Sequence, residues 1–202
     1  MTIIRSVDDL KAIYGSGSEA SNLKVTPFLT PEYRRMIEAA PFVALATVGP
    51  EGADCSPRGD KGGVVRVEDE RTILLPDWRG NNRVDSLINI VRDPRVALMF
   101  LVPGSTTTMR INGKAVVSIA PELLQSFEMD GKHPRTVIVI TVDEVYFQCA
   151  RALMRSELWN PDNFVDPASL PTPGAMLKAA KQDFDKDTYD REWPARAVST
   201  LW

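Results

Sequence analysis

A series of strand-length apolar runs between residues 42 and 149 constrains the fold of this chain more than any other feature. Runs of β-branched and apolar residues that are bounded by turn residues are typical of β-strands. Because no βαβ alternation joins these runs, the pattern predicts an antiparallel, closed or partly closed barrel rather than a doubly wound sheet. The runs are Phe42–Val48, Val64–Val67, Thr72–Leu75, Val96–Val102, Thr107–Ile119 and Thr136–Cys149.

Short turn sequences indicate how these strands are connected. Gly49-Pro-Glu-Gly52 ends the first run and is expected to return the chain as an antiparallel neighbour. Glu68-Asp-Glu70 lies between two short runs and predicts a second hairpin. Asn112-Gly113 interrupts a long run and indicates a turn or a bulge. The class is therefore mainly β (α+β), with the helices at its flanks.

Helix signals lie outside the strand region or between its runs. Ser6-Val-Asp-Asp9 has the character of a capping box, and Thr30-Pro31-Glu32 places an N-cap and a first-turn proline before Tyr33–Ala40. These motifs predict two N-terminal helices. Helical spacing of apolar residues, or a short apolar cluster, predicts three further helices at Val84–Val91, Leu123–Met129 and Gly174–Phe184.

The pattern divides the chain into three parts. Residues 1–40 form an N-terminal helical extension, residues 41–159 form the barrel, and residues 160–202 form a C-terminal loop and helix. The prolines after Cys149 predict an extended loop there. The chain ends on the apolar pair Leu201-Trp202, so we expect this last part to pack on the barrel or on a partner subunit.

Composition excludes several function classes. The 202 residues carry a net charge of -3 and no Lys/Arg tract, which argues against a nucleic-acid partner and an anionic membrane surface. No apolar run is long enough to cross a bilayer, and charges interrupt the N-terminus too early for a signal peptide. The expected location is therefore the cytoplasm. Cys55 and Cys149 lie far apart without metal-ligand spacing, so reduced thiols are expected.

The segment Leu75–Ser86 combines turn residues, amides and two guanidinium groups between an apolar strand and an amphipathic helix. Arg79 and Arg83 could hold a phosphate dianion, and backbone N–H groups at the helix start would add neutral donors. The alternative is a solvated turn with ordinary surface arginines. For this segment alone, the two interpretations stand about equal.

Two neighbouring segments favour an anionic ligand. Cys55–Gly63 carries three glycines that allow close backbone approach to a flat ligand, and Ser56, Arg58 and Lys61 supply donors. The alternative for this segment is an ordinary hairpin turn with exposed charges. Arg110 lies within a predicted strand, where an unpaired charge would be costly, so it also needs an anion.

Residues for hydrolytic chemistry are scarce. His133 is the single histidine and lies in the turn Gly131-Lys-His-Pro134, which argues against a Ser-His-Asp triad and a histidine-rich metal site. The carboxylate pairs Asp69/Glu70 and Asp143/Glu144 are interpreted as turn and strand-edge charges. We therefore assign no catalytic residue and no metal ligand from the sequence.

Taken in order, the motifs from Pro41 to Trp159 resemble the flavin-binding split-barrel proteins related to pyridoxamine 5'-phosphate oxidase. The resemblance is closest to a branch of that superfamily with Ser-Pro-Arg-Gly-Asp and Gly-Asn-x-Arg motifs. It implies a six-stranded antiparallel split barrel, a homodimer, and FMN bound at the subunit interface. The motifs are Phe42–Val48 with its turn, Ser56–Asp60, Leu74–Pro76 leading into Gly80–Arg83, Asp93–Val96, Met109–Gly113 and Cys149–Trp159.

The resemblance also implies roles for particular residues. It assigns the FMN phosphate to Arg79, Asn82 and Arg83, with Lys61 as a further candidate. It assigns the surroundings of the isoalloxazine ring to Ser56, Pro57, Arg58 and Gly59, with Arg58 or Arg110 stabilising negative charge on the reduced flavin. Arg155 and Trp159 are candidates supplied by the other subunit.

One departure from the family limits the functional inference. The oxidase holds pyridoxal phosphate with an Arg-x-His element near its C-terminus, and this sequence contains none. Pyridoxamine 5'-phosphate oxidase activity is therefore not expected. The expected function is an FMN-dependent oxidoreductase of a small molecule. The alternatives are a non-catalytic flavin-binding redox module and a split barrel that binds deazaflavin or haem.

Overall fold

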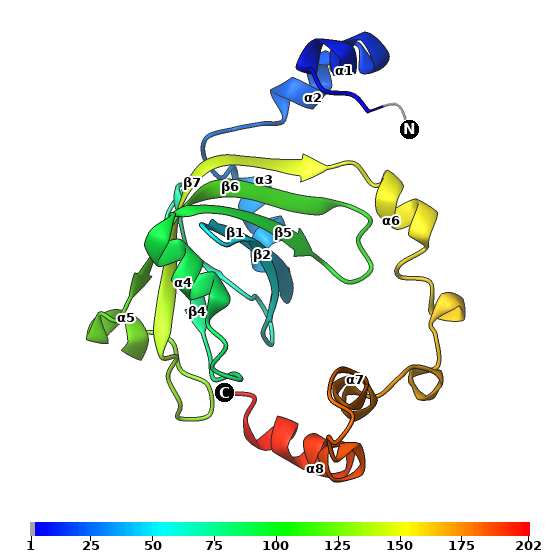
Figure 1. Ribbon diagram of the computed structural model, residues 1–202. Coiled ribbons are helices and arrows are strands. Elements are labelled where there is room, and N and C mark those ends of the chain that lie inside the picture. The colour runs from blue at the N-terminus through cyan, green and yellow to red at the C-terminus, as the bar shows by residue number, and fades with distance from the viewer. Residues whose placement is uncertain (1–2) are drawn as a thin grey trace.

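The computed structural model describes residues 3–202 and is built around one antiparallel sheet that curves into a split barrel (Figure 1). The strand order is β2-β1-β5-β6-β7-β4-β3. The mainly β class is confirmed, with one difference from the six strands expected: β2, the antiparallel neighbour that follows the turn Gly49–Gly52, adds a seventh strand to the six apolar runs. The strands are β1 Phe42–Gly49, β2 Gly52–Gly59, β3 Arg66–Val67, β4 Thr72–Asp77, β5 Arg95–Leu101, β6 Thr108–Ser118 and β7 Thr136–Gln148.

Strands β6 and β7 are the longest and join the two parts of the barrel. The end of β7 pairs with the start of β6 beside β5, and the start of β7 pairs with β4. The register shifts at Asn112/Gly113, so the expected turn or bulge is a bulge. A Cβ at Gly113 would overlap the backbone carbonyl of Thr141, which explains why glycine stands there.

Alternating burial along the strands places one side of each in the core. In β1, Val43, Leu45 and Thr47 are buried between half-buried neighbours. The apolar cluster also includes Ile37 and Ile90, which come from helices that cover the barrel. The predicted hairpins 42–59 and 66–77 are both present.

The helices begin where the sequence motifs place them in the N-terminal half. The side chains of Ser6 and Thr30 accept backbone N–H groups as N-caps, as predicted. A short third helix, α2, lies between the two expected ones. The helices are α1 Val7–Tyr14, α2 Glu19–Leu23, α3 Pro31–Glu38, α4 Asp85–Arg92, α5 Pro121–Gln125, α6 Arg151–Ser156, α7 Pro173–Ala180 and α8 Lys186–Ser199.

The extended loop predicted after Cys149 is correct only in part, because helix α6 and two 3-10 turns (η1 Pro161–Asn163 and η2 Pro167–Ser169) interrupt it. The helix predicted at Gly174–Phe184 is present as α7, and the unpredicted α8 follows it. Helix α8 contains Pro194, a residue that normally argues against a helix interior. Figure 1 shows α7 and α8 together and set apart from the barrel, with the last residues returning to it. Among residues 3–202, no helix has the length and apolar character that a bilayer crossing requires.

Candidate functional site

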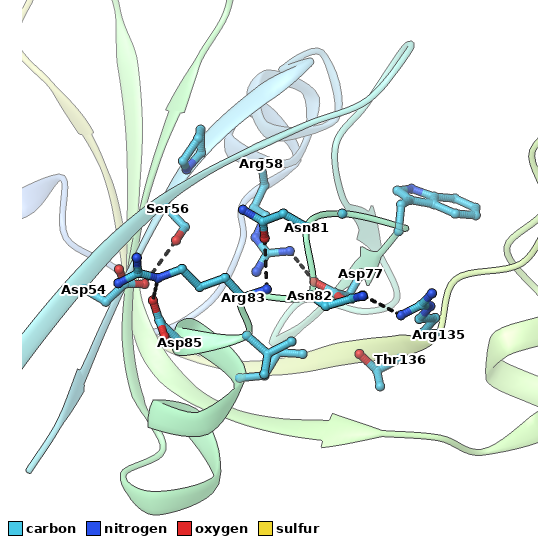
Figure 2. Close-up of a pocket in the computed structure, with 15 residues that line it drawn as sticks. Asp54, Ser56, Arg58, Asp77, Asn81, Asn82, Arg83, Asp85, Arg135 and Thr136 are labelled. Carbon is cyan, nitrogen blue, oxygen red and sulfur yellow. Dashed lines mark hydrogen bonds and ion pairs between the residues drawn. The ribbon is translucent and has the colours of Figure 1, made fainter. Parts of the chain in front are cut away.

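An open pocket of about 500 Å³, here called the outer pocket, lies where β2, the end of β4, the start of α4 and the start of β7 meet (Figure 2). Strand β2 supplies one wall, and the loop after β4 supplies the opposite one. Its lining is mixed polar and apolar, as in small-molecule sites. The lining residues are Asp54, Ser56, Pro57, Arg58, Asp77, Trp78, Gly80, Asn81, Asn82, Arg83, Val84, Asp85, Leu87, Arg135 and Thr136.

Three side chains of β2 reach the pocket because alternate residues of a strand share a face: Asp54, Ser56 and Arg58. The hydroxyls of Ser56 and Ser86 donate to Asp54 Oδ2 at 3.1 and 2.6 Å. These bonds, that of Ser86 above all, lower the pKa of Asp54 below its ordinary value. Asp54 therefore stays ionised near neutral pH, and the Ser56 hydroxyl presents its lone pairs rather than its hydrogen to a ligand.

Replacing Ser86 by alanine should raise the pKa of Asp54, because the strongest hydrogen bond to its ionised form is lost. The lowered folded-state pKa contributes stability that is present above the unfolded pKa and is lost as pH falls through the folded value. The Ser86→Ala variant should lose that stability at a higher pH than the original protein. Carboxyl ¹³C NMR titration of Asp54 checks this, and an unchanged titration would contradict it.

Arg58 and Asp77 form an ion pair at the centre of the pocket, and both side chains are largely buried. Arg58 Nε is buried and has no hydrogen-bond partner in the described structure. Thr136 Oγ1 is in the same condition, and it lies opposite Asp77 in the β4/β7 pairing. Buried polar atoms normally have partners, so these two atoms, together with Arg66 Nε away from the pocket, are exceptions in the described structure.

The loop after β4 is shaped by Asn82, which has a positive φ of 62°. Its Oδ1 accepts a hydrogen bond of 2.7 Å from Arg135. Next to it, Arg83 pairs with Asp85 on the surface, and Asn81 Oδ1 accepts the Arg83 backbone N–H at 2.9 Å. Figure 2 shows Arg83 reaching towards Asp54 and Asp85, with Arg135 on the other side.

The aspartates and arginines that line the outer pocket are equal in number, so their formal charges cancel. Arg58 and Arg83 are each paired with an aspartate, whereas Arg135 makes no ion pair among residues 3–202. The Arg83–Asp85 pair is exposed, so the energy needed to exchange its carboxylate for another anion is small. Arg83 and Arg135 are thus the cations available to an incoming anion.

A second cavity of about 240 Å³, here called the inner cavity, adjoins the outer pocket. The two share Pro57, Arg58, Trp78 and Gly80, which form a common wall. Further lining comes from the end of β2, from β4 and from the C-terminus. These residues are Gly59, Asp60, Val64, Leu75, Pro76, Arg79 and Leu201.

The structure brings most of the predicted cofactor residues to these two spaces. The outer pocket contains Ser56, Pro57, Arg58, Asn82 and Arg83, whereas Gly59 and Arg79 line the inner cavity. Arg79 is therefore separated from Arg83 by the common wall, although the sequence places the two in one turn.

Four predicted residues lie outside both linings. Lys61 Nζ lies 4.8 Å from the centre of the Trp202 ring. The Arg110 guanidinium lies 5.2 Å from the centre of the Tyr146 ring, so an aromatic face, and not the expected anion, meets its charge. Trp159 donates to the Ser105 carbonyl at 2.7 Å, and Arg155 is exposed on α6.

Sequence reasoning missed Asp54, Asp77, Arg135 and Thr136. Asp54 had a signal, because it lies two residues before Ser56 in a strand and shares its face. Thr136 and Asp77 meet only through the β4/β7 register, which joins residues far apart in the chain. No local sequence pattern predicts such a pairing of distant residues.

The cysteines and the histidine of the described chain lie outside both cavities. Within residues 3–202 no group of three or more His, Cys, Asp and Glu side chains could hold a metal ion. Cys55 and Cys149 are free, as expected. His133 Nδ1 lies 2.7 Å from the Phe127 carbonyl, away from both cavities.

Comparison with solved structures finds distant similarity. HupZ from Group A Streptococcus is 19% identical, over 58% of this chain and 92% of that chain, with a TM-score of 0.46. An FMN-binding protein from Syntrophomonas wolfei is 11% identical, over 71% of this chain and 97% of that chain, with a TM-score of 0.46. General stress protein 26 from Bacillus anthracis is 15% identical, over 56% and 88% of the two chains, with a TM-score of 0.44.

No curated protein matches the chain. The pyridoxamine 5'-phosphate oxidase family model matches residues 29–149, from the last residues before α3 to the end of β7. This match spans more than half of the chain and includes every strand of the barrel and both walls of the outer pocket. The protein therefore belongs to the pyridoxamine 5'-phosphate oxidase family.

Proposed function

We propose that the outer pocket binds FMN and that the protein is an FMN-dependent oxidoreductase of a small molecule. One observation carries the proposal: a pocket of about 500 Å³ in a chain of this family is lined by Arg58 and Thr136, whose Nε and Oγ1 atoms are buried without a hydrogen-bond partner. That volume lies within the range of about 300–1,000 Å³ typical of cofactor sites.

The residues present fit the two ends of the cofactor. The phosphate would lie at the start of α4, whose first turn has no side-chain cap and so leaves its backbone N–H groups free for an anion. Arg83 and Arg135 would supply positive charge there. The flat ring would lie along β2, where Pro57 and Ser56 form the wall.

When bound, FMN would supply the redox chemistry, with hydride passing between substrate and flavin. The chain's own residues would bind and orient. Arg58 would direct its Nε–H, and Thr136 its hydroxyl, at ring acceptors, which satisfies the two unpartnered atoms. Asp77 would hold the Arg58 guanidinium in place, and ionised Asp54 would keep the Ser56 hydroxyl turned away from the ligand.

The proposal includes a homodimer. Large apolar side chains are exposed on the side of the barrel that carries β5, the end of β7 and α6, among them Met99, Phe147, Met154 and Leu158. A second copy would cover them and could bring Arg155 and Trp159 to the cofactor. Light scattering tests this, because a monomer at micromolar concentration with FMN bound would contradict it.

Haem binding and a non-catalytic redox module are the two alternatives to this function that the lining residues and cavities can distinguish. A haem would need an axial ligand, and the outer pocket lining includes no His, Cys, Met or Tyr. A non-catalytic redox module would bind the same flavin without a substrate subsite next to it. The inner cavity beside the common wall favours an enzyme.

The absorption spectrum of the purified protein, before and after incubation with FMN, tests the proposal. We expect the two visible bands of oxidised flavin and quenching of flavin fluorescence on binding. An intense Soret band would instead show haem, and a deazaflavin would give a different spectrum. Either result, or no flavin retained after incubation, would contradict the proposal. Reduction of the bound flavin by NADH or NADPH then identifies an electron donor.

A further inference from the structure

The last residues of the chain return to the barrel and dock on Asp60. Trp202 Nε1 donates to Asp60 Oδ1 at 3.2 Å, and Lys61 Nζ lies over the indole ring. Leu201 lines the inner cavity. Figure 1 shows that the chain passes through α6, α7 and α8 after β7 and that its C-terminus lies beside the barrel. Leu201 is therefore part of the wall of this cavity.

Asp60 also holds the wall that the two cavities share. Its Oδ2 accepts the indole N–H of Trp78 at 2.7 Å, and its Oδ1 accepts the backbone N–H of Lys61 at 2.8 Å. One carboxylate thus links Trp78, which lines both cavities, with Trp202 at the end of the chain. This carboxylate therefore connects Trp202 to the common wall.

The lining of the inner cavity suits a small amphipathic anion as its ligand. Val64, Leu75, Pro76 and Leu201 provide apolar surface. The Arg58 charge is matched by Asp77, and the Asp60 carboxylate is engaged by three N–H donors. Arg79 makes no ion pair among residues 3–202, so it is the cation left for a ligand.

We propose that the inner cavity binds a compact monocarboxylate with an apolar body, with Arg79 holding the carboxylate and Leu201-Trp202 acting as a latch on one side of the cavity. At about 240 Å³, the cavity excludes drug-sized ligands. The ligand's role as a substrate rests on the proposed function, since only a flavin in the adjoining pocket makes it one. The binding of this ligand does not depend on the proposed function.

The latch can open without disturbing the barrel. Trp202 is held by one hydrogen bond and by the Lys61 ammonium over its ring, and each of these interactions is weak on its own. No strand ends at the latch, and α8 ends at Ser199. A ligand can therefore enter when Leu201 and Trp202 move away from Asp60, and their return narrows the opening of the cavity.

Titration with benzoate and with its neutral analogue benzamide tests the cavity, using NMR of the four tryptophan indole N–H groups in FMN-free and FMN-loaded protein. We expect benzoate to shift the resonances of Trp78 and Trp202 and to leave Trp159 and Trp193 unchanged. Benzamide should bind at least tenfold more weakly. The variant Arg79→Gln should weaken benzoate at least tenfold, whereas the exposed, distant Arg71→Gln should not.

Two variants that keep an aromatic ring test the latch. Trp202→Phe removes the indole N–H and should weaken benzoate several-fold while also shifting the Trp78 resonance, since both indoles share Asp60. Trp193→Phe on α8 is the matched control and should change neither, because Trp193 stacks on Tyr189. A thermal melt confirms that each variant is folded. Unchanged benzoate affinity in folded Trp202→Phe would overturn the latch.

The outcomes separate this proposal from the proposed function. Benzoate binding that depends on Arg79 in FMN-free protein supports the inner cavity, whether or not FMN binds. FMN bound in the outer pocket, with benzoate no tighter than benzamide, overturns the inner cavity and leaves the FMN proposal standing.

Discussion

Replacing Arg58 by alanine is expected to lower the free energy of unfolding by about 2–4 kcal/mol. The side chains of Arg58 and Asp77 are 21% and 14% exposed, so removal of the guanidinium leaves a mostly buried carboxylate without its partner. Full burial costs about 3–5 kcal/mol in such cases, and the partial exposure of this pair reduces the figure. Urea denaturation at neutral pH measures the change.

The double variant Arg58→Ala/Asp77→Ala is the control, because it removes both charges. It should be more stable than Arg58→Ala alone, and the difference reports the cost of the unpaired carboxylate. Both variants should lose FMN affinity, since each lacks the Arg58 Nε donor. A double variant no more stable than the single one would contradict the role assigned to the ion pair.

Replacing Arg83 by alanine should weaken FMN binding about tenfold to a hundredfold and leave riboflavin binding nearly unchanged. The two ligands differ by the phosphate alone, and a hydrogen bond to a charged group contributes about 1.5–3 kcal/mol. Arg83 is exposed, and its partner Asp85 is easily exchanged for a phosphate. Quenching of flavin fluorescence gives both dissociation constants.

Arg92→Ala is the matched control for this prediction. Arg92, the last residue of α4, is likewise an arginine in an exposed ion pair, with Glu51, but it lies outside the outer pocket. The Arg92 variant should bind FMN as the original protein does. Equal losses of FMN and riboflavin in the Arg83 variant would assign Arg83 a structural role. Arg79→Ala should spare FMN, because Arg79 lines the inner cavity.

Local patterns predicted most of the barrel because its strands carry their own signals. The alternation along Phe42–Val48 and the turn Gly49-Pro-Glu-Gly52 are enough to define the first hairpin. Helices α6 and α8 were not predicted, since proline-rich surroundings and Pro194 locally argue against a helix. The contacts that override such signals, for example those between Asp190 and the start of α7, are long-range.

The candidate site, like the fold, could be predicted only where its residues lie close together in the sequence. Ser56 and Arg58 were found because they lie within one glycine-bearing segment, which was predicted as a turn and is the end of strand β2, and Asn82 and Arg83 because they lie within one turn. The separation of Arg79 from Arg83 depends on backbone conformation at the loop, including the positive φ of Asn82, which residue type alone does not determine.

The contacts of Leu201-Trp202 could not be predicted from the sequence motif alone. An apolar terminal pair indicates docking, but its partner could have been the barrel or a second subunit. The structure places Trp202 on Asp60 of the same chain. Asp60 belongs to the Ser-Pro-Arg-Gly-Asp motif, yet no role could be assigned to it until Trp78 and Trp202 were seen to share its carboxylate.

The affinity of the unaltered protein for FMN relative to riboflavin tests the central claim most directly. The claim is that the outer pocket holds a flavin through its ring and its phosphate together. We expect FMN to bind at least about tenfold more tightly than riboflavin, with the difference shrinking at high salt as the phosphate contacts are screened. Equal affinities at low salt, or no binding of either flavin, would contradict the account.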